Sequence, residues 1–578
     1  MPSSSGGSPL LNAAQGAPGK LDSNEALELG SPRFADPALA QCMRDNGALA
    51  AWRMALARGP REAATLASGE FAVALREISG RTFLAVDRFA IRTLCYRVSS
   101  GQLHFAARAD ELAMAGEAAE IDPQAIFDYL HFHVIPSPRT VFKGVYRLPP
   151  GHYALFDNGQ LTVAPYWVPE FKVHADMPLE PAKGEFRQLL RNAVAAQLDG
   201  SKPACFLSGG TDSSTVAGLI SQVAAGHAAT YSIGFEAQGY DEMAFARIAA
   251  RHFGTEHHEY YVTPVDLVKS IGHVAATYDQ PFGNSSALPA YYCALQAKAD
   301  GVTKLLAGDG GDELFGGNSR YAMQRIFGWY GMLPASLRSG LMEPFFGLDA
   351  VARTPLLKKC SSYIRQAKVP MPDRLQMYNL LRRLGVGEVL TPGFLAQVDP
   401  GDALRQQRAV WAQAVAAGDL DRTLAYDWRY TLAESDLPKV RGTTQLAGIG
   451  VGFPFLDDEL LAFSMRLPQT YKLRGLKLRW FFKEALRGFL PDEVITKKKQ
   501  GFGLPFGVWA TQHPALKALA VDSVRSIGER GLVRRDFIKT LIDTHLPAHP
   551  GYYGEMVWIL MMLEQWLRRH APAFRIAP

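Results

Sequence analysis

The sequence lacks both a long hydrophobic run and a recognisable export signal. Its longest uninterrupted apolar run, Met556–Leu563, is far shorter than the roughly 20 residues that span a bilayer, so we expect no membrane span and a buried helix there. Residues 1–20 contain no basic stretch followed by an apolar core, which argues against a secretory signal. Their Ser, Gly, Pro and Ala content predicts a flexible tail over residues 1–30.

Cysteines are few, and the excess of positive charge is small. The five cysteines show no CxxC spacing, which argues against a disulfide framework or a zinc site; they are Cys42, Cys95, Cys205, Cys293 and Cys360. A reducing cytoplasm is therefore the expected location. The formal net charge is +5 and the clearest basic cluster, Lys497–Lys499, is short, so we expect no nucleic-acid partner.

The chain is long enough for more than one core. Its 578 residues, 48% hydrophobic and 20% charged, predict two main domains. Between residues 68 and 108, short β-type segments separated by Gly, Ser and Asp indicate an antiparallel sheet. A helical stretch at 121–133 and a strand-turn-strand pattern close this domain near Trp167, and we expect the linker at 168–182.

The pattern changes from Glu185 onward. Strands then alternate with helices of similar length, which indicates βαβ units and a parallel sheet. After residue 320 the pattern is mostly helical, and no internal repeat is found.

A glycine-rich loop, Phe206–Ser214 (FLSGGTDSS), follows a β-type run and opens a helix. Its glycines let the backbone approach a ligand closely, and the amides at the helix start face an anion. The alternative is a plain strand-to-helix turn. No Walker lysine is present, and an Asp and two hydroxyls follow the glycines. SGGxDS resembles the pyrophosphate-binding signature of ATP pyrophosphatases, which cleave ATP between the α and β phosphates.

A second candidate anion site, Leu305–Gly317 (LLAGDGGDELFGG), again places glycines after a buried strand, now with three carboxylates. Carboxylates beside a phosphate loop suit Mg²⁺, which bridges phosphate oxygens to one or two carboxylates, or a group that orients the substrate or moves its proton. The alternative is a solvated acidic turn.

These motifs, taken together, resemble the asparagine synthetase family. The segments in that family's order are SGGTDSS, YSIGFEAQGYDE, FGTEHHEYYVTP, QPFGNSSALPAYY, LLAGDGGDELFGGNSRY, LPKV, PFLD and KKKQGFGLPF. They cover most of residues 200–510. From about residue 66, GEFAVAL, LAVDRFAIRTLCYR and IFDYL…VFKGVYRLPPGHY also resemble the later part of the family's glutaminase domain.

The resemblance implies an α/β protein with ATP and Mg²⁺ as cofactors. It implies a degenerate Ntn-type (N-terminal-nucleophile) β-sandwich flanked by helices at 31–167. A doubly wound parallel-sheet ATP pyrophosphatase domain, similar to adenine nucleotide α-hydrolases, with a helical C-terminal part follows at 183–570. The implied substrates are a small-molecule or peptide carboxylate and an amine donor. Dimers are common among such proteins, but no dimer surface is legible in the sequence.

The resemblance also assigns roles to residues. It implies adenosine contacts at Leu207 and Ile233 and a further nucleotide contact at Ala307 and Gly308. The implied phosphate loop comprises Ser208, Gly209, Gly210, Asp212, Ser213 and Ser214. We expect Asp212, Asp312 or both to bind Mg²⁺. The catalytic candidates are Asp309, which the family uses to form the acyl-adenylate, Glu313 as a supporting carboxylate, and Lys499 near the reacting carbonyl and phosphate. For Lys497–Lys499 the alternative is a solvated basic turn.

Two departures from the family pattern bear on substrates. Glutamine-dependent members carry a cysteine directly after the initiator methionine, whereas this sequence has Pro2. The one Arg-Gly-Pro, at 58–60, lies in a helical stretch, so we expect no glutamine site. The family also carries Asp-Arg after LPKV and Glu-x-Arg before PFLD, where this chain has Arg441-Gly442 and Gly450-Val451-Gly452. Losing those charges should change which carboxylate or amine is held there, so the acid need not be aspartate.

Three functions stay open. The first is amidation of aspartate or another acid, such as a uronic-acid sugar, with ammonia that is free or supplied by a partner. The second is amide formation within one substrate, as in β-lactam synthetases or lasso-peptide cyclases. The third is a non-catalytic scaffold, which the intact SGGTDSS, GDGGDE and KKKQGF motifs disfavour.

Overall fold

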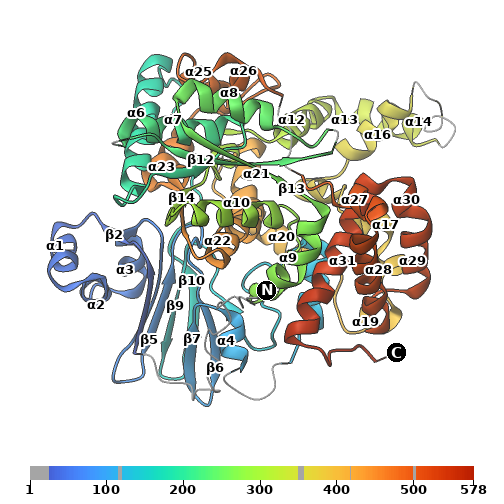
Figure 1. Cartoon of the computed structure of the whole chain (residues 1–578), viewed down its shortest axis with the longest axis horizontal. Coiled ribbons are helices and arrows are strands. Elements are labelled where there is room, and N and C mark those ends of the chain that lie inside the picture. The colour runs from blue at the N-terminus through green and yellow to red at the C-terminus, as the bar shows by residue number, and fades with distance from the viewer. Residues whose placement is uncertain are drawn as a thin grey trace, which may run out of the picture.

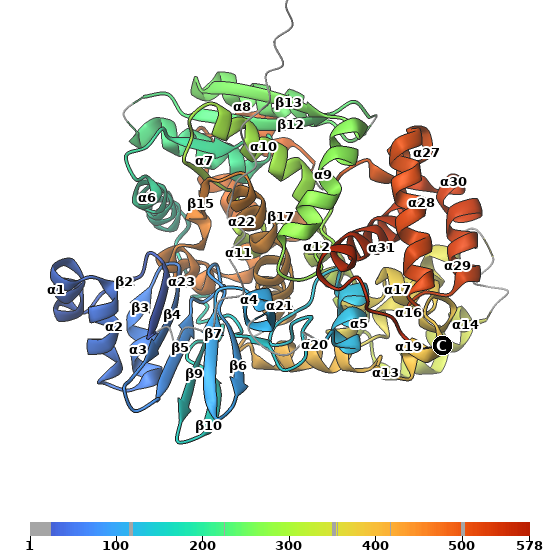
Figure 2. The same cartoon turned by 60° about the horizontal axis from the view of Figure 1, so that its bottom comes forward.

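A computed structural model describes residues 25–114, 120–224, 226–237, 239–348, 354, 357–416, 418–498 and 503–577. Two packed β-sheets near the N-terminus lie beside a larger α/β part, and a group of C-terminal helices lies against that part (Figure 1). The second view shows the N-terminal sheets next to the α/β part from another side (Figure 2). The mixed α/β class predicted from the sequence is confirmed.

The first N-terminal sheet is antiparallel. Its strand order is β1-β4-β5-β9-β10, with bounds Ala26–Gly30, Phe71–Arg76, Thr82–Val86, His152–Asp157 and Gln160–Pro165. Alternate residues of β4 point to opposite faces. Phe71, Val73 and Leu75 face a cluster around Trp52, whereas Ala72 and Ala74 face the second sheet. The sheet is therefore buried on both sides.

The second sheet has the order β7-β6-β8 (Gln102–Ala106, Cys95–Ser99, Tyr146–Arg147). The predicted strands at 68–108 are thus present, divided between two packed sheets rather than joined in one. Helices α1 (Pro37–Asn46), α2 (Ala48–Leu56) and α3 (Pro60–Leu66) cover the outer face of the first sheet. Strand β1 corrects the predicted tail, because residues 26–30 pair with β4.

The larger part contains a five-stranded parallel sheet in the order β13-β12-β11-β14-β15. The bounds are β11 Ala204–Phe206, β12 Ala229–Phe235, β13 Glu256–Val262, β14 Lys304–Leu306 and β15 Gly450–Gly452. Helices α6 (Leu179–Gln197), α7 (Thr211–Val223) and α8 (Met243–Phe253) pack on one face, and α10 (Ala287–Ala299) packs on the other. The strand order reverses between β11 and β14, where open α/β sheets bind ligands at the carboxyl ends of their strands.

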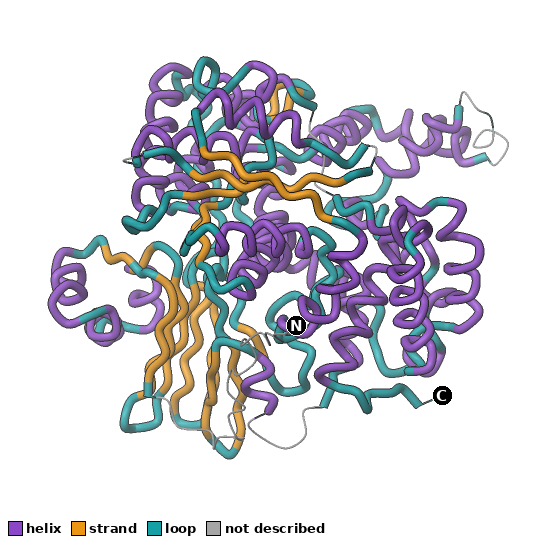
Figure 3. Tube along the Cα trace, viewed as in Figure 1, coloured by secondary structure: helices purple, strands orange, loops and turns teal. Residues whose placement is uncertain are grey.

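The described chain after residue 320 is mostly helical, as predicted (Figure 3). Its longer helices are α12 Ser319–Gly331, α16 Lys358–Ala367, α20 Asp402–Gln413, α21 Asp419–Asp427, α22 Leu437–Leu446, α23 Asp458–Arg466, α28 Pro514–Glu529 and α31 Pro550–His570. The predicted core helix is confirmed, because Met556–Leu563 lies within α31 and is buried throughout. Among the described residues, none of the helices is long and apolar enough to cross a bilayer.

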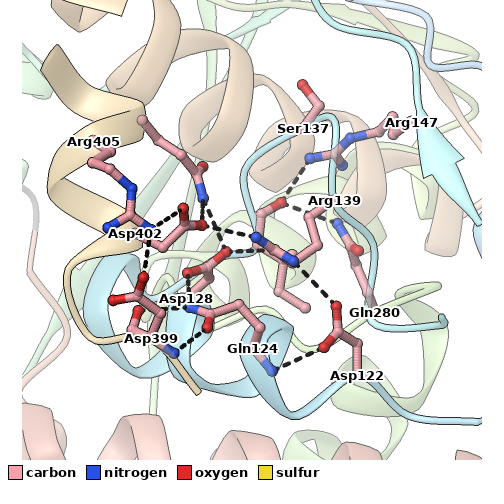
Figure 4. A network of polar contacts seen from close by, with 12 residues as sticks. Asp122, Gln124, Asp128, Ser137, Arg139, Arg147, Gln280, Asp399, Asp402 and Arg405 are labelled. Atoms are coloured by element: carbon pink, nitrogen blue, oxygen red, sulfur yellow. Dashed lines mark hydrogen bonds and ion pairs between the residues drawn. The ribbon is translucent and has the colours of Figure 1, made fainter. Parts of the chain in front are cut away.

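Ion pairs join the N-terminal part to these helices. Arg139 binds Asp122 and Asp128, at the start of and within α5 (Pro123–Phe132), and also Asp402 of α20 (Figure 4). A second, more deeply buried group lies nearby: Glu434 accepts from Ser137 and pairs with Arg147 and Arg429. Burial raises the pKa of Glu434, but the two arginines outweigh it and leave that pKa below its ordinary value.

We expect Glu434→Gln to lower the free energy of unfolding by about 3 kcal/mol at neutral pH, because two buried guanidinium groups lose their counter-charge. A lowered carboxyl pKa stabilises the fold above the unfolded-state value of about 4.3, and this contribution is lost as pH falls through the folded-state value. Urea denaturation should therefore show the deficit shrinking as the pH is lowered below about 4.

The matched control is Glu529→Gln, whose carboxylate forms an exposed pair with Arg535. It should change stability by no more than a few tenths of a kcal/mol. Equal losses in the two variants, or a Glu434→Gln deficit that does not change with pH, would contradict this account of the interface.

Candidate active site

The first glycine-rich loop connects β11 to α7. Gly209 has φ +68°, a left-handed conformation that favours glycine, and a Cβ there would collide with the backbone of Ala246. The hydroxyl of Ser213 accepts from the Ser208 amide (3.1 Å) and lies 3.1 Å from the Ser208 hydroxyl. The amides at the start of α7 have no side-chain cap, so the loop presents donors to an anion.

The second loop follows β14 and packs directly on the first. A Cβ at Gly308 would lie 2.8 Å from the Ser213 amide nitrogen, so only glycine allows this approach. The same turn places Asp309 and Glu313 beside the phosphate loop. The two sequence motifs, about a hundred residues apart, thus form one site at the point where the strand order reverses.

A cavity of about 360 Å³ lies between these loops. Its apolar lining includes Phe206, Leu207, Ile233, Met243, Pro289 and Cys293. Its polar lining includes Ser208, Asp212, Ser213, Gly308, Asp309, Asp312, Glu313, Asp436 and Lys439. Apolar side chains together with phosphate-binding amides suit a nucleotide, whose base is apolar and whose phosphates are charged.

Lys439 is the cation closest to the catalytic candidates. Its Nζ lies 3.5 Å from Asp309 Oδ1 and 2.9 Å from Asp436 Oδ1. Burial lowers the pKa of Lys439, but the two carboxylates outweigh burial and raise that pKa above its ordinary value, so the ammonium persists at neutral pH. Burial raises the pKa of Asp309, and Lys439 opposes that rise.

Glu313 is a buried carboxyl group on α11 (Gly311–Phe315). Burial, reinforced by the negative charges of Asp312, Asp436 and Asp427, raises its pKa well above the ordinary value. The shift favours the protonated carboxyl, so Glu313 places a group that can hold or exchange a proton at the edge of the cavity.

The two predicted magnesium ligands share a guanidinium group. Arg479 Nη2 lies 2.6 Å from Asp212 Oδ1, and its Nε lies 3.0 Å from Asp312 Oδ1. Two converging carboxylates fit Mg²⁺, which typically binds one or two carboxylates and completes its shell with phosphate oxygens and water. Among the described residues, no group of three His, Cys, Asp or Glu side chains is placed to hold a metal.

A second cavity, of about 620 Å³, meets the first at the phosphate loop. The two share Ser208, Asp212, Ser213, Glu242 and Asp312. The second is rich in cations, namely Lys477, Arg479, Lys483, Arg487, Lys497 and Lys498. Lys497 is nearly buried, pairs with Glu242 (3.0 Å) and lies over the Phe245 ring. A cationic cavity beside a phosphate loop suits a polyphosphate.

Most of the predicted site residues meet at these cavities. Gly210 lines only the second cavity, and Gly209 shapes the turn. Ser214 and Ala307 are buried and line neither cavity. Lys499 lies outside the described residues. The alternative of a solvated basic turn does not apply to Lys497, because its side chain is nearly buried and pairs with Glu242.

Three functional candidates were missed from the sequence. LPKV was recognised as a motif without a role for Lys439, although that segment is the clearest signal for it. Arg479 is far from both loops in sequence, and its left-handed backbone, φ +54°, is visible only in the structure. Glu242 lines both cavities and pairs with Lys497, but in the sequence it is simply the second residue of the acidic pair Asp241-Glu242, to which no chemical role was assigned.

The fold and the site together define an ATP-dependent ligase built on a parallel-sheet nucleotide-binding domain. A family model described as asparagine synthase matches residues 185–568, and one described as a glutamine amidotransferase domain matches residues 53–167. The chain belongs to the asparagine synthase family.

Its relatives carry two kinds of name. A Bacillus subtilis protein named asparagine synthetase [glutamine-hydrolyzing] 1 is 25% identical over 83% of this chain and 74% of its own. A putative asparagine synthetase [glutamine-hydrolyzing] of Mycobacterium tuberculosis is 25% identical over 86% and 76%. A Penicillium rubens protein named amidase chyE is 28% identical over 80% and 73%.

We expect Arg479→Met to lower the free energy of unfolding by about 3–5 kcal/mol, because it removes the buried guanidinium group with which both carboxylates pair. Added Mg²⁺ should reduce this loss, since a divalent cation can bridge the same carboxylates. Thermal and urea denaturation with and without Mg²⁺ measure both effects. Arg487→Met, which breaks an exposed pair with Glu484, should cost less than about 1 kcal/mol and be insensitive to Mg²⁺. A deficit in Arg479→Met that Mg²⁺ leaves unchanged would argue against a metal at Asp212 and Asp312.

Proposed function

We propose that the chain forms an amide in two steps: ATP adenylates a carboxylate and releases pyrophosphate, and an amine other than glutamine then displaces AMP. The observation that carries the proposal is the meeting, at one phosphate loop, of a cavity with apolar and polar lining, a cationic cavity, and the ion pair between Lys439 and Asp309. In this proposal the adenosine lies at Leu207 and Ile233. The pyrophosphate lies toward the second cavity.

The chemistry requires positive charge at the reacting atoms. Adenylation brings a negative carboxylate against a negative α-phosphate, so cations and aligned amides must offset the charge. Lys439, held by Asp309, can orient the acid, and the amides at the start of α7 bind phosphate oxygens. Lys499 stays a candidate for the same role on the family motif. Mg²⁺, when bound with ATP at Asp212 and Asp312, would offset charge on the leaving pyrophosphate.

Glu313 serves the second step. The attacking amine must lose a proton as it forms the amide, and a buried carboxylate with a raised pKa can accept that proton. Lys439 is assigned to adenylation and Glu313 to amide formation, so a variant of each residue tests a different step.

The two cysteines of the N-terminal part support an amine other than glutamine. Cys95 lies buried in β6, where burial raises the pKa of its thiol, so a thiolate is disfavoured. Cys42 lies half-buried on α1 and packs with the cluster around Trp52. Neither thiol is fully exposed to a glutamine substrate.

The replaced charges near PFLD support an acid other than aspartate. A Cβ at Gly442 would lie 2.6 Å from the Tyr278 ring, and one at Gly452 would collide with the Gln197 side chain. The places where the family carries arginines are thus closed by other residues. A different carboxylate must be recognised by different contacts.

Pyrophosphate release from ATP and Mg²⁺ tests the proposal directly. Release should depend on a carboxylic acid, and amide formation should occur with ammonium or another amine but not with glutamine. Aspartate, uronic acids and peptide acids are the first acids to compare, with ammonium and glutamine tested separately. Absence of acid-dependent release across the set would favour a non-catalytic scaffold, and glutamine-driven amide formation would refute the proposed amine.

Glu313→Gln and Lys439→Met form a matched pair. Lys439→Met should slow both pyrophosphate exchange and amide formation, because it removes charge from the first step. Glu313→Gln should keep exchange near the wild-type rate and slow amide formation by roughly 10²–10⁴-fold, the usual effect of a positioned base. Circular dichroism checks that each variant is folded, and pyrophosphate exchange measures its adenylation step. Equal effects of Glu313→Gln on both steps would remove its role as the base.

The proposed role of Lys499 has its own test. Lys499→Met should abolish adenylation while folding, checked by circular dichroism, stays intact. Lys498→Met is the neighbouring control and should retain activity. Near-normal pyrophosphate exchange in Lys499→Met would remove this lysine from the mechanism.

A further inference from the structure

A third cavity, also of about 360 Å³, lies between the N-terminal sheets and the parallel-sheet part. Its charged and amide lining comprises Arg92, Arg108, Glu111 and Arg147 from the N-terminal part and Asp279, Gln280, Glu434, Arg441 and Gln445 from the other. Gln280 and Arg147 are seen beside the ion-pair network of the interface (Figure 4). None of these side chains belongs to the site described above.

Arg441 is the arginine of this lining that forms no ion pair within the described chain, although Asp279 and Asp87 act on it from farther away. The other three arginines have partners: Arg92 pairs with Glu70, Arg108 with Asp110 and Arg147 with Glu434. Arg441 donates from Nη1 to the carbonyl of Ile91 (2.7 Å), and the described part of the chain places no carboxylate within ion-pair distance of it. Burial, together with Arg92 and Arg147, lowers the pKa of Arg441 to about 10, so the group remains charged at neutral pH.

Two acceptors face the same cavity. Gln280 is only 7% exposed, and its buried Oε1 has no hydrogen-bond partner. A buried acceptor without a donor costs free energy, typically 1–3 kcal/mol, which a ligand can recover. Asp279 accepts from the Ala109 amide (2.9 Å), and no cation of the described chain lies within ion-pair distance of it.

We propose that this cavity binds an α-amino acid as its zwitterion, with the carboxylate on Arg441 and the ammonium on Asp279 and the Oε1 of Gln280. A guanidinium group without a counter-charge favours a carboxylate, with which it can form two parallel hydrogen bonds. A simple carboxylic acid would leave Asp279 without a cation and the Oε1 of Gln280 without a donor. Ammonia would leave Arg441 without an ion-pair partner. A molecule with both a carboxylate and an ammonium group can bind Arg441, Asp279 and Gln280 together.

Helix α22 lies between this cavity and the active site. Residues three and four apart share a helix face, so Asp436, Lys439 and Val440 line the first cavity, whereas Pro438, Arg441, Gly442 and Gln445 line the third. Tyr278, which also lines the third cavity, donates from its hydroxyl to the carbonyl of Lys439 (3.3 Å). An occupant therefore contacts the helix that positions the active-site lysine.

Calorimetric titration of the full chain tests the site. The probes are the standard L-amino acids, with acetate and methylamine as controls that each carry one of the two charged groups. At least one amino acid should bind, and acetate and methylamine should bind at least about tenfold more weakly, since each lacks charge-assisted hydrogen bonds. Absence of binding by every amino acid, or equal binding by acetate, would overturn the proposal.

Variants on the two faces of α22 locate the binding. Arg441→Gln should weaken the amino acid at least about tenfold. Asp279→Asn should do the same while its side-chain oxygen still accepts from Ala109, so a folding defect in one variant leaves the other informative. Lys439→Gln, in the first cavity, should leave this affinity within about twofold. Loss of binding in Lys439→Gln alone would place the amino acid in the first cavity and overturn the proposal.

A labelled amino group separates binding at this cavity from use in the reaction. With ¹⁵N in the amino acid, a changed rate of amide formation without label in the product supports an effector bound at the interface. Label in the product that Arg441→Gln leaves unchanged would place the amino acid in the first cavity and overturn the proposal. The site rests on the proposed function only for this rate measurement, because failure of acid-dependent pyrophosphate release would refute the proposed function and leave the calorimetric binding unchanged.

Discussion

One guanidinium group holds together the two loops on which the site depends. Arg479 reaches Asp212 at the start of α7, Asp312 in the second loop and the hydroxyl of Thr211 (2.5 Å). Without it, the two carboxylates would lose the buried guanidinium group that they share. The cation thus joins the start of α7 to the second loop, and the two sides of the site are held together by one side chain.

The sequence predicted those features that depend on local pattern. Alternation along Phe71–Arg76 and neighbouring segments identified strands, and the strand-then-glycine pattern at Ser208 and Gly308 identified the two loops. Glycine is required at 209 and 308 because other backbone lies where a side chain would stand. Such constraints act within a few residues of the motif, and so they can be read from the motif itself.

Other features depended on contacts between distant segments. Nothing near residue 479 indicates that its side chain closes the site, and nothing near residue 95 shows that β6 leaves the first sheet to join a second. The pairing of Lys439 with Asp309 joins α22 to the loop after β14. Charge pairs of this kind depend on the packing of whole elements, which local pattern does not specify.

Helix α22 gives the protein two surfaces of separate use on a single element. Substitutions at positions such as 441, 442 or 445 can change what the interface recognises, while Lys439 keeps its carboxylate partners on the other face. A substitution on one face can therefore change the lining of one cavity while the side chains of the other cavity stay as they are, and the two faces are joined by ten residues of one rigid element.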